Sequence, residues 1–266
     1  MENIDNNTII SVAKDAAVEA GKYLLSQFGK VNGIIVKGDR NLATNADKTA
    51  EKMIVEKIMR VFPEHNIMGE EDDYQQKKSD FLWIIDPLDG THNFIKGINI
   101  FGVSIGLWYC DRFIAGVIYM PVDDELYYAY EGLGAWKNGR RISVSQISDM
   151  KEASCSFDSS IRLLPETMLD LLGAVSCASF NVRMFGSSVR LLTYVAEGVI
   201  DYAIEFHDRP WDFAGAVALI VEAGGEFRGL RAQSPTPETV GYVASNKYLY
   251  RVLNDMVTGC IEKRRK

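Results

Sequence analysis

The stretch Trp83-Ile84-Ile85-Asp86-Pro87-Leu88-Asp89-Gly90-Thr91 organises the rest of the chain. The apolar run Phe81–Ile85 predicts a buried strand, which leads directly into two acids, a proline and a glycine. Carboxylates at the end of a buried strand need a partner, because a desolvated charge is costly. Mg²⁺ suits that position, since it binds through one or two carboxylates plus substrate phosphate. The Gly90-Thr91 step would offer backbone N–H groups to an anion, so the stretch predicts a metal-bound phosphate.

Composition restricts the classes of protein that the chain can belong to. Its 266 residues are 47% apolar and 24% charged, which is typical of a globular protein with one large domain or two fused sub-domains. The net charge of −7 disfavours non-specific nucleic-acid binding, whereas an anionic substrate remains possible if metal ions supply positive charge. The basic run Lys263–Lys266 is interpreted as a solvated tail. We therefore expect no nucleic-acid partner.

The cysteines and the chain start indicate the compartment. Cys110, Cys155, Cys177 and Cys260 show no metal-binding spacing and are expected to be free thiols in a reducing environment. The acidic, polar N-terminus does not resemble a signal peptide, and no apolar run approaches 18 residues. We expect a cytoplasmic protein without a membrane span.

The first half of the chain predicts two helices against an antiparallel sheet. A helix is expected from Asp5 to Phe28, capped by Asn6 or Asn7, and a second from Ala46 to Phe62, capped by Thr44 and Asn45. Turn signals separate the remaining apolar runs, as in a meander. The expected strands are 33–37, 65–68, 81–85, 101–109, 113–120, 125–131 and 142–144, the last after an Asn138-Gly139 hairpin. The polar segment 38–41 is expected to be a mobile loop that follows Lys37.

The second half alternates strands and helices. Strands are expected at 154–157, 182–185, 199–205 and 241–244, and helices at 165–173, 187–197, 211–223 and 246–257. Alternation of this kind predicts an α/β unit with a sheet between helices. The polar residues 146–152 are the best boundary, which gives an N-terminal α+β sub-domain over 1–148 and a C-terminal α/β sub-domain over 149–266.

Two further acidic features have alternative interpretations. The run Glu70-Glu71-Asp72-Asp73 is typical of a solvated loop, but a second acidic cluster begins at Asp86, only 13 residues later. Asp212 opens an almost wholly apolar helix, where an acid is often an N-cap. A capping residue can also be a metal ligand, so both interpretations of Asp212 stay open.

These residues together resemble the inositol monophosphatase family of Mg²⁺-dependent, lithium-sensitive phosphatases. The family's first signature, Trp-Ile/Val-Ile/Val-Asp-Pro-Ile/Leu-Asp-Gly-Thr-x-Asn-Phe, matches 83–94 throughout. Its second signature, which begins Trp-Asp-x-Ala and ends Glu-Ala-Gly-Gly, resembles 211–225. Further similarities are Gly69-Glu70-Glu71, Lys37 with Thr44–Asp47, and Ala244-Ser245-Asn246. The similarity runs in order along nearly the whole chain and implies a layered α-β-α-β-α sandwich.

The resemblance implies two to three Mg²⁺ ions per site. It assigns the metal ligands as Glu70, Asp86, the Leu88 carbonyl, Asp89 and Asp212, with Asp86 shared between two ions. Asp47 and Thr91 resemble the pair that orients and deprotonates the attacking water, and Glu70 would assist them at a weaker third ion. Uncatalysed phosphate-ester hydrolysis is very slow, and a pair of metal ions can clamp the attacking and leaving oxygens. The implied mechanism is in-line displacement by metal-activated water without a phosphoenzyme.

Substrate contacts also follow from the resemblance. The implied set is Asp89, Gly90, Thr91, Ser188, Arg190, Glu205 and Asp212. Arg190 follows Gly186-Ser187-Ser188 as a lysine does in members that act on 3′-phosphoadenosine 5′-phosphate, so it would meet a second phosphate or else be a surface arginine. The Asn93-Phe94 pair and Glu205 favour inositol monophosphate or a related sugar phosphate. Fructose 1,6-bisphosphate and 3′-phosphoadenosine 5′-phosphate remain alternatives.

Other functions have less support in the sequence. The three histidines, His65, His92 and His207, form no pattern of nucleophilic catalysis, although His207 lies near Glu205. A metal-binding regulatory protein on the same scaffold is the alternative that is not an enzyme. It would be expected to have lost an acid, whereas the four metal acids, Asp47 and Thr91 are all present. A homodimer and inhibition by lithium are implied by the resemblance alone.

Overall fold

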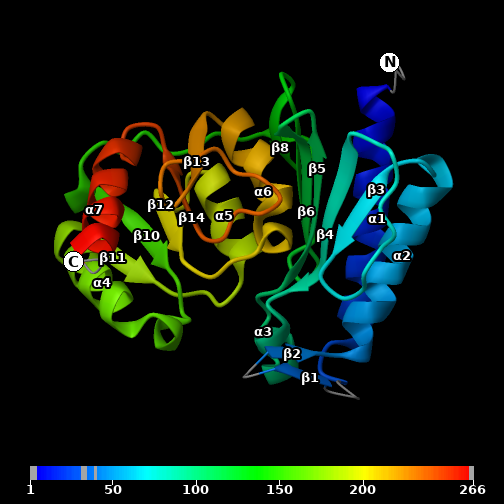
Figure 1. Cartoon of the computed structure of the whole chain (residues 1–266), viewed down its shortest axis with the longest axis horizontal. Helices are drawn as coiled ribbons and strands as arrows, with labels where there is room; N and C mark the ends of the chain where they lie inside the picture. Colours follow the sequence, from blue (N-terminus) through cyan, green and yellow to red (C-terminus); the bar gives the residue numbers. More distant parts are fainter. Residues whose placement is uncertain (1–4, 31–34, 39–40, 264–266) are drawn as a thin grey trace.

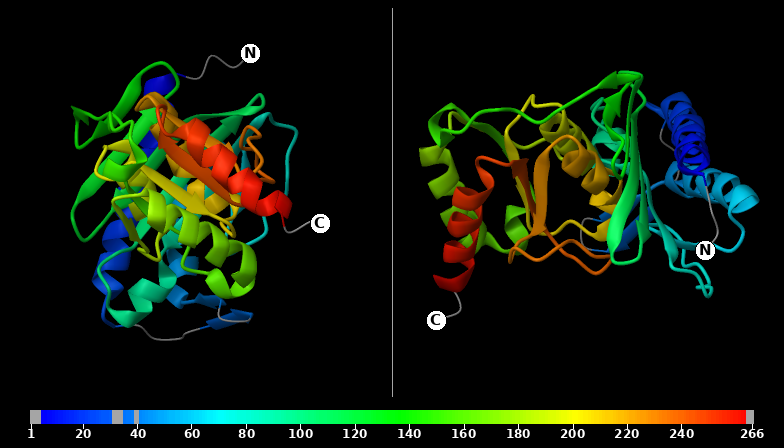
Figure 2. Two further views of the ribbon diagram at one scale, coloured as in Figure 1. Left: turned by 90° about the vertical axis from the view of Figure 1, so that its left-hand side faces the viewer. Right: turned by 90° about the horizontal axis from the view of Figure 1, so that it is seen from above.

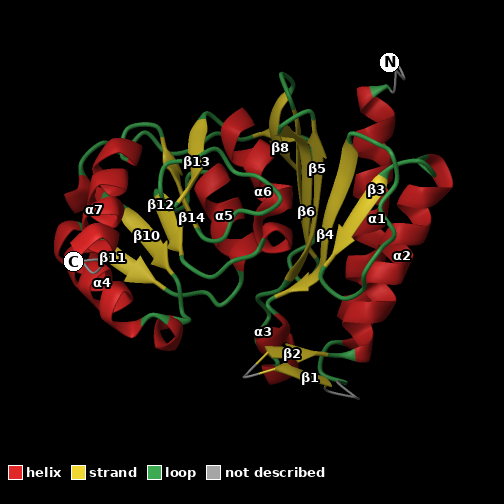
Figure 3. Cartoon of the chain, in the orientation of Figure 1, coloured by secondary structure: helices red, strands yellow, loops and turns green. Residues whose placement is uncertain are grey.

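Alternating layers of helix and sheet make up the fold, in the order helix, sheet, helix, sheet, helix (Figure 3). The computed structural model describes residues 5–30, 35–38 and 41–263, with the backbone only at 35–38 and 41–43. The layers follow one another along the long axis of the molecule, and the two termini lie at its opposite ends (Figure 1). The view from above shows the same succession (Figure 2). This arrangement confirms the predicted layered sandwich.

The first outer layer is a pair of helices, α1 (Asn6–Gln27) and α2 (Asn45–Val61). Each buries one apolar face against the first sheet, because its apolar residues recur at helical spacing. The Thr44 side chain accepts from the Ala46 amide and caps α2 as predicted, whereas α1 is capped by Asp5 and not by Asn6 or Asn7.

The first sheet has seven strands in the order β3-β4-β5-β6-β7-β8-β9. Its strands are β3 (Asn66–Gly69), β4 (Phe81–Asp89), β5 (Gly102–Tyr109), β6 (Arg112–Met120), β7 (Glu125–Tyr130), β8 (Gly134–Lys137) and β9 (Arg140–Arg141). The predicted meander is confirmed, since every neighbouring pair from β4 to β9 is antiparallel, while β3 and β4 are parallel. The expected strand at 142–144 is wrong, because the return strand of the hairpin ends at Arg141.

The middle layer consists of α5 (Ser188–Ala196) and α6 (Pro210–Glu222). Both helices come from the second half of the chain, yet α6 packs against strands β4 to β8 of the first half. Nearly every residue of α6 after Asp212 is buried, which explains its apolar sequence. A single hydrophobic cluster therefore joins the halves, and the sub-domain boundary at 148/149 stays a prediction.

Small residues let α6 approach the sheet closely. Gly106 and Gly116 face each other on β5 and β6, directly beneath Ala214 and Gly215. A Cβ atom at Gly116 would lie 2.1 Å from the Gly215 carbonyl oxygen, a distance that no side chain tolerates. The Ser104 hydroxyl also lies 3.2 Å from the Gly215 amide nitrogen, which donates to it. This contact places the start of α6 against β5 at Ser104, the residue that pairs with Asp86 of β4.

The second sheet has five strands in the order β11-β10-β12-β14-β13 and carries α4 and α7 on its outer face. Its elements are β10 (Ser154–Phe157), α4 (Pro165–Ala178), β11 (Asn181–Arg183), β12 (Tyr202–Glu205), β13 (Gly225–Gly229), β14 (Tyr242–Asn246) and α7 (Tyr250–Lys263), with short 3₁₀ turns η1 (Met150–Glu152) and η2 (Ile161–Leu163). The alternation of strands and helices is confirmed. Strand β13 was not predicted, and α7 begins four residues later than expected because Asn246 still belongs to β14.

A small unit lies at one end of the first sheet, where α3 (Thr91–Lys96) approaches the hairpin of β1 (Ile35–Gly38) and β2 (Asn41–Ala43) (Figure 1). Lys37 lies on β1, and its side chain is outside the described part of the chain, as are residues 39–40 of the expected mobile loop. Among the described helices, none combines the length and apolar character that crossing a membrane requires.

Candidate metal centre and phosphate site

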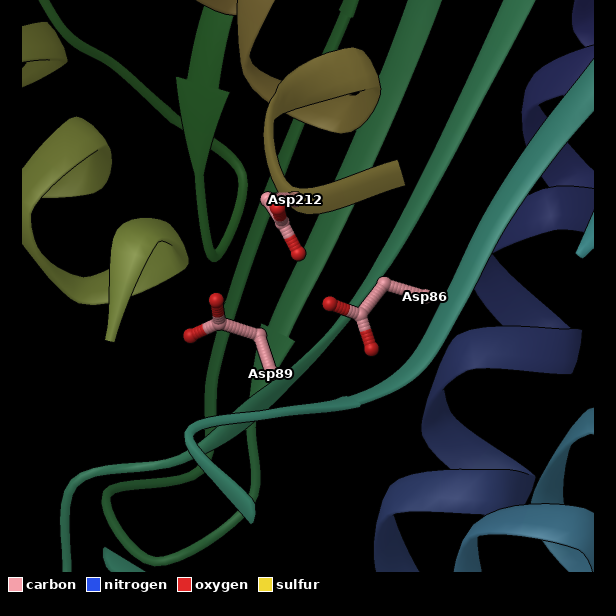
Figure 4. A group of neighbouring side chains, drawn as sticks. All are labelled: Asp86, Asp89 and Asp212. Carbon is pink, nitrogen blue, oxygen red and sulfur yellow. The ribbon is translucent and has the colours of Figure 1, made fainter. Parts of the chain in front are cut away.

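Three carboxylates from two distant segments converge at the seam between β4 and α6. Asp86 and Asp89 lie at the end of β4, and Asp212 lies in the first turn of α6 (Figure 4). One carboxylate oxygen from each lies within 4.8 Å of the other two. The structure therefore brings together three of the predicted metal ligands.

An irregularity in β4 turns both of its acids toward the same place. Asp86 pairs with Ser104 and Asp89 pairs with Gly102, so β4 has one residue more than β5 between these pairs. Such a bulge re-aims side chains that would otherwise alternate between the faces of the sheet. The Leu88 amide donates to the Asp86 carboxylate at 2.9 Å, which fixes the bend.

The charges of this cluster are not balanced by any salt bridge within the described residues. Burial raises the pKa of Asp89 to about 7, in spite of the hydrogen bonds that it accepts. Burial first, and then repulsion from neighbouring acids, raises the pKa values of Asp86 and Asp212 well above the usual range. Hard carboxylate oxygens with unbalanced charge match the ligand preference of Mg²⁺, so the residues fit such an ion.

Glu70 lies beside the three clustered carboxylates. Its amide donates to the Ile85 carbonyl at 3.2 Å, which extends the parallel pairing of β3 and β4 by one residue. Its charge contributes to the raised pKa values of Asp86, Asp89 and Asp212. The run after β3 is therefore not simply a solvated loop, because its first acid faces the cluster.

Thr91 and Asp47 meet behind the cluster, as the resemblance implied. The Thr91 hydroxyl lies 3.2 Å from the Asp47 carboxylate and 3.0 Å from the Leu88 carbonyl. Asp47 is fully buried at the start of α2, where its other oxygen accepts from the Thr44 amide at 2.8 Å. Burial raises the pKa of Asp47 above its usual range, although its hydrogen bonds act in the opposite direction.

Asp89 also caps helix α5, although no sequence pattern links the two. Its carboxylate accepts from the Ser188 amide at 3.0 Å and the Val189 amide at 3.3 Å, and the Ser187 hydroxyl donates to it as well. A carboxylate at a helix N-terminus is favoured by the helix dipole. The cluster and α5 are therefore held in fixed register.

A polar cavity of about 200 Å³ opens beside Asp89 and Asp212. It is lined by the predicted substrate residues Ser188 and Glu205, and by two acids that were not predicted, Asp158 and Asp208. Burial raises the pKa of Asp208 to about 7, and burial with repulsion from Asp208 and Asp158 raises that of Glu205 well above its usual range. Asp158 directly follows a predicted strand, as Asp86 does, and that signal could have identified it.

Arg190 is not among the residues that line this cavity, and its contact with a second phosphate stays a prediction. Its guanidinium is 3% exposed and bonds Glu125 at 2.9 Å, with Asp123 as a second partner. It also stacks on the Tyr194 ring, 4.9 Å from the ring centre. These partners occupy the side chain, so Arg190 stabilises the contact between α5 and β7. The alternative interpretation of a surface arginine is wrong, because the residue is buried.

The histidines are not arranged for nucleophilic catalysis. His92 is exposed on α3, and His65 stacks between aromatic rings while it accepts from the Trp83 indole. The His207 ring lies 3.0 Å from the Asp158 carboxylate, and no described contact joins it to Glu205.

The comparison with family models identifies the class. Residues 5–262 match the model of the inositol monophosphatase family. The chain therefore belongs to that family, and its fold and acidic cluster are those of an inositol-monophosphatase-type phosphomonoesterase.

Individual relatives agree with this class. The chain is 38% identical over 231 residues to a fructose-1,6-bisphosphatase/inositol-1-monophosphatase of Aquifex aeolicus, with 85% of this chain and 87% of the relative covered. It is 35% identical over 224 residues to the Nus factor SuhB of Escherichia coli, with 82% and 83% covered. The solved structure of a Thermotoga maritima IMPase superposes with a TM-score of 0.87 at 28% identity, covering 97% of this chain and 99% of that one.

Proposed function

We propose that this protein is a Mg²⁺-dependent phosphatase that hydrolyses inositol monophosphate or a related sugar phosphate. The observation that carries the proposal is the convergence of Asp86, Asp89 and Asp212 within 4.8 Å, with Asp89 and Asp212 lining a polar cavity. Ionised carboxylates that are buried without a cationic partner are unfavourable, and a bound metal ion would supply that partner. The neighbouring Thr91–Asp47 pair supplies the groups that water activation needs.

Metal binding would use the four acids and one carbonyl. Asp86, Asp89, Asp212 and Glu70 would provide carboxylate oxygens, and Leu88 its carbonyl oxygen. When bound, Mg²⁺ would neutralise these acids, polarise the phosphate ester and lower the pKa of a bound water. We propose two to three ions per site, in line with the family resemblance.

The phosphate would lie at the start of α3. Gly90 precedes the helix and has a left-handed backbone (φ 82°). As in any helix, the first amides of α3 have no intrahelical acceptor. Gly90 and Thr91 would direct these N–H groups to the phosphate oxygens. A side chain at Gly90 would meet the Ile100 carbonyl oxygen at 2.8 Å, which explains why glycine is needed there.

Proton transfer would run from the attacking water through Thr91 to Asp47. The Thr91 hydroxyl would accept the water's proton as it donates its own to Asp47, 3.2 Å away. Desolvation makes Asp47 a stronger base than an exposed aspartate, because it raises the pKa of that carboxyl. Glu70 would orient the same water from the opposite side.

The charge of the cavity favours an alcohol without a second phosphate. Asp158, Glu205 and Asp208 remain as carboxylates beyond the four proposed metal ligands, and Arg190 is occupied elsewhere. They would accept hydrogen bonds from the hydroxyls of a polyol, with Ser188 beside them, and would repel a second phosphoryl group. Fructose 1,6-bisphosphate stays the main alternative, because the Aquifex relative is named for that activity as well. The acids of the cavity would also repel the second phosphate of 3′-phosphoadenosine 5′-phosphate, so that substrate is disfavoured.

Phosphate release from a substrate panel tests this proposal. The panel is inositol 1-phosphate, fructose 1,6-bisphosphate, histidinol phosphate and 3′-phosphoadenosine 5′-phosphate, each with Mg²⁺ and with a chelator. We expect Asp89→Asn to lose nearly all Mg²⁺-dependent release while the protein stays folded. Asp255→Asn removes the same charge from the exposed face of α7 and should be fully active. Unchanged turnover in Asp89→Asn would refute the assignment.

A regulatory role without catalysis is the second candidate, because one relative is named a Nus factor. Retention of every predicted metal acid argues against it. Absence of phosphate release from the whole panel, together with measurable Mg²⁺ binding, would favour that candidate.

Further properties extend the proposal: the dimer and the lithium inhibition rest on the resemblance alone, and the other two rest on the composition of the sequence. We propose a homodimer in the cytoplasm that does not bind nucleic acid and is inhibited by millimolar Li⁺. Insensitivity to Li⁺ would indicate the more resistant, fructose-bisphosphatase-like members.

A further inference from the structure

A fully buried glutamate, Glu51, lies next to the metal centre without belonging to it. It stands four residues after Asp47 on α2, so both side chains project from the same face of the helix. Its carboxylate accepts from the Glu71 amide at 2.9 Å, the Asp72 amide at 3.0 Å and the Tyr74 hydroxyl at 2.9 Å. No lysine or arginine among the described residues forms a salt bridge with it.

All of these contacts surround Glu70. Gly69, the residue before Glu70, packs so closely on the carboxylate that a Cβ atom there would lie 2.5 Å from Glu51 Oε1. Glu71, the residue after Glu70, donates its amide to the same carboxylate. The Glu70 amide itself is bonded to the Ile85 carbonyl on β4. The backbone of Glu70 is therefore fixed from α2 on one side and from β4 on the other.

Helix α2 thus touches two parts of the site with two buried acids. Asp47 reaches Thr91, at the start of α3, and Glu51 reaches the segment that carries Glu70. Burial of an anion without a cation is tolerated only if hydrogen bonds satisfy it, and here backbone amides of 71 and 72 do so. On the side of α2, the Glu70 segment is therefore held through one side chain, that of Glu51.

We propose that Glu51 is a positioning residue that holds the Glu70 segment at the metal cluster and so sets the affinity for Mg²⁺. Glu51 contacts neither substrate nor metal in this account; it acts through the backbone on both sides of Glu70. Replacing such an outer partner of a metal ligand typically weakens metal binding by about 10- to 100-fold. The inference rests on the proposed function only in taking Mg²⁺ as the ion.

Glu51→Gln is the test, because glutamine keeps the shape but offers one acceptor oxygen in place of two. The midpoint of Mg²⁺ binding, measured by titration calorimetry and by the rise in melting temperature, should shift upward by about tenfold. The kcat at saturating Mg²⁺ should stay within about twofold, since the catalytic groups are unchanged. Hydrogen exchange at amides 71 and 72 should accelerate in the metal-free protein.

A matched control separates positioning from general stability. Asp201 is a buried carboxylate that accepts from the Ser154 amide at 2.7 Å, at the far end of β12 from Glu205. Asp201→Asn should lower the melting temperature without moving the Mg²⁺ midpoint. If Glu51→Gln also leaves the midpoint unchanged while wild type binds Mg²⁺, the inference is wrong and the proposed function is untouched.

Tyr74→Phe keeps the test decisive if Glu51→Gln does not fold. It removes one donor to Glu51 and retains the carboxylate, so the Mg²⁺ midpoint should rise by about two- to threefold. An unchanged midpoint in Tyr74→Phe would overturn the inference in that case. Loss of Mg²⁺ binding in wild type itself would instead refute the proposed function.

Discussion

Two groups of charged side chains meet helix α5, and they differ in whether their charges are balanced within the chain. The first contains Asp86, Asp89 and Asp212, where burial raises every pKa and no described cation pairs with the acids. The second contains Arg190 and Lys137 with three acids, Asp123, Glu125 and Glu197. There, burial alone would raise the pKa of Glu125, but hydrogen bonds from Lys137 and Arg190 hold it below its usual range.

The difference separates a binding site from a structural contact. Acids that find cations within the chain are satisfied, and they stabilise the packing of α5 on β7. Acids that find none need a ligand from outside, and a divalent metal provides it. Burial of a charged side chain alone is therefore a weaker guide to function here than charge balance, because the buried Arg190 is paired within the chain.

Removing one acid from the metal cluster should have the largest effect. We expect Asp86→Asn to lower phosphate release by at least about a hundredfold, because even outer partners of metal ligands cost up to that much. In the metal-free protein the same change should raise the free energy of unfolding, by about 1 to 2 kcal/mol, because it relieves repulsion. Urea unfolding with a chelator present, beside a phosphate-release assay, measures both. A metal-free variant less stable than wild type would contradict the unbalanced charge.

Removing the cation from the balanced group should do the reverse. Arg190→Met removes the contacts with Glu125 and Tyr194 but leaves Glu125 paired with Lys137, so it should cost about 1 to 2 kcal/mol in urea unfolding. The KM for inositol 1-phosphate should stay within about twofold, because Arg190 does not line the cavity. Arg251→Met, on the exposed face of α7, is the control for loss of a positive charge. A raised KM with unchanged stability would restore Arg190 as a substrate contact.

The pH dependence of stability should also reflect the unbalanced charge of the metal cluster. The folded pKa of Asp89 is about 7 against a usual 3.8, so its contribution to stability is complete below pH 4 and is lost as the pH rises through 7. Metal-free protein should therefore melt a few degrees lower at pH 8 than at pH 6, while Mg²⁺ stabilises more at pH 8 because its ligands must be deprotonated. Melting curves of wild type and Asp86→Asn isolate the cluster, since the opposite contribution of His65 is common to both. Equal slopes in the two proteins would count against the account.

The smallest effect concerns the acids of the cavity. Asp208→Asn removes one of the three carboxylates beyond the metal ligands, so repulsion of a second phosphate should weaken. We expect kcat/KM for fructose 1,6-bisphosphate, relative to inositol 1-phosphate, to rise by about threefold. The ratio should not move in Asp255→Asn. A lower ratio in Asp208→Asn would mean that the cavity recognises the bisphosphate instead of repelling it.

Much of the fold could be predicted from the sequence, because apolar periodicity and turn residues indicate most helices and strands. The apolar spacing of α1 and α2 and the turns between β5, β6 and β7 gave elements within a few residues of their observed bounds. Strand β13 was hidden because Gly224-Gly225 reads as the end of a helix and Glu226 and Arg228 as a polar loop. Asn246 reads as a helix start, whereas its side chain accepts from the Tyr248 and Leu249 amides while its backbone stays in β14.

The acids of the site could be predicted from the sequence, whereas the side chains and amides that surround them could not. The family resemblance named Asp86, Asp89 and Asp212, and the structure brings them together. The spacing of residues along a helix does not reveal what a side chain contacts elsewhere in the fold. The sequence therefore suggested a substrate contact for Arg190 and no role for Glu51. Asp208 had no local signal, because its place in the cavity depends on the packing of β12 against α5.

Mg²⁺ binding measured together with phosphate release from inositol 1-phosphate is the decisive test of the metal centre. Calorimetric titration at pH 8 should show Mg²⁺ binding to wild type and markedly weaker binding to Asp86→Asn. Release of phosphate should appear only with Mg²⁺ and only in wild type. Full phosphate release in the presence of a chelator, or equal Mg²⁺ binding by both proteins, would contradict a metal centre at Asp86, Asp89 and Asp212.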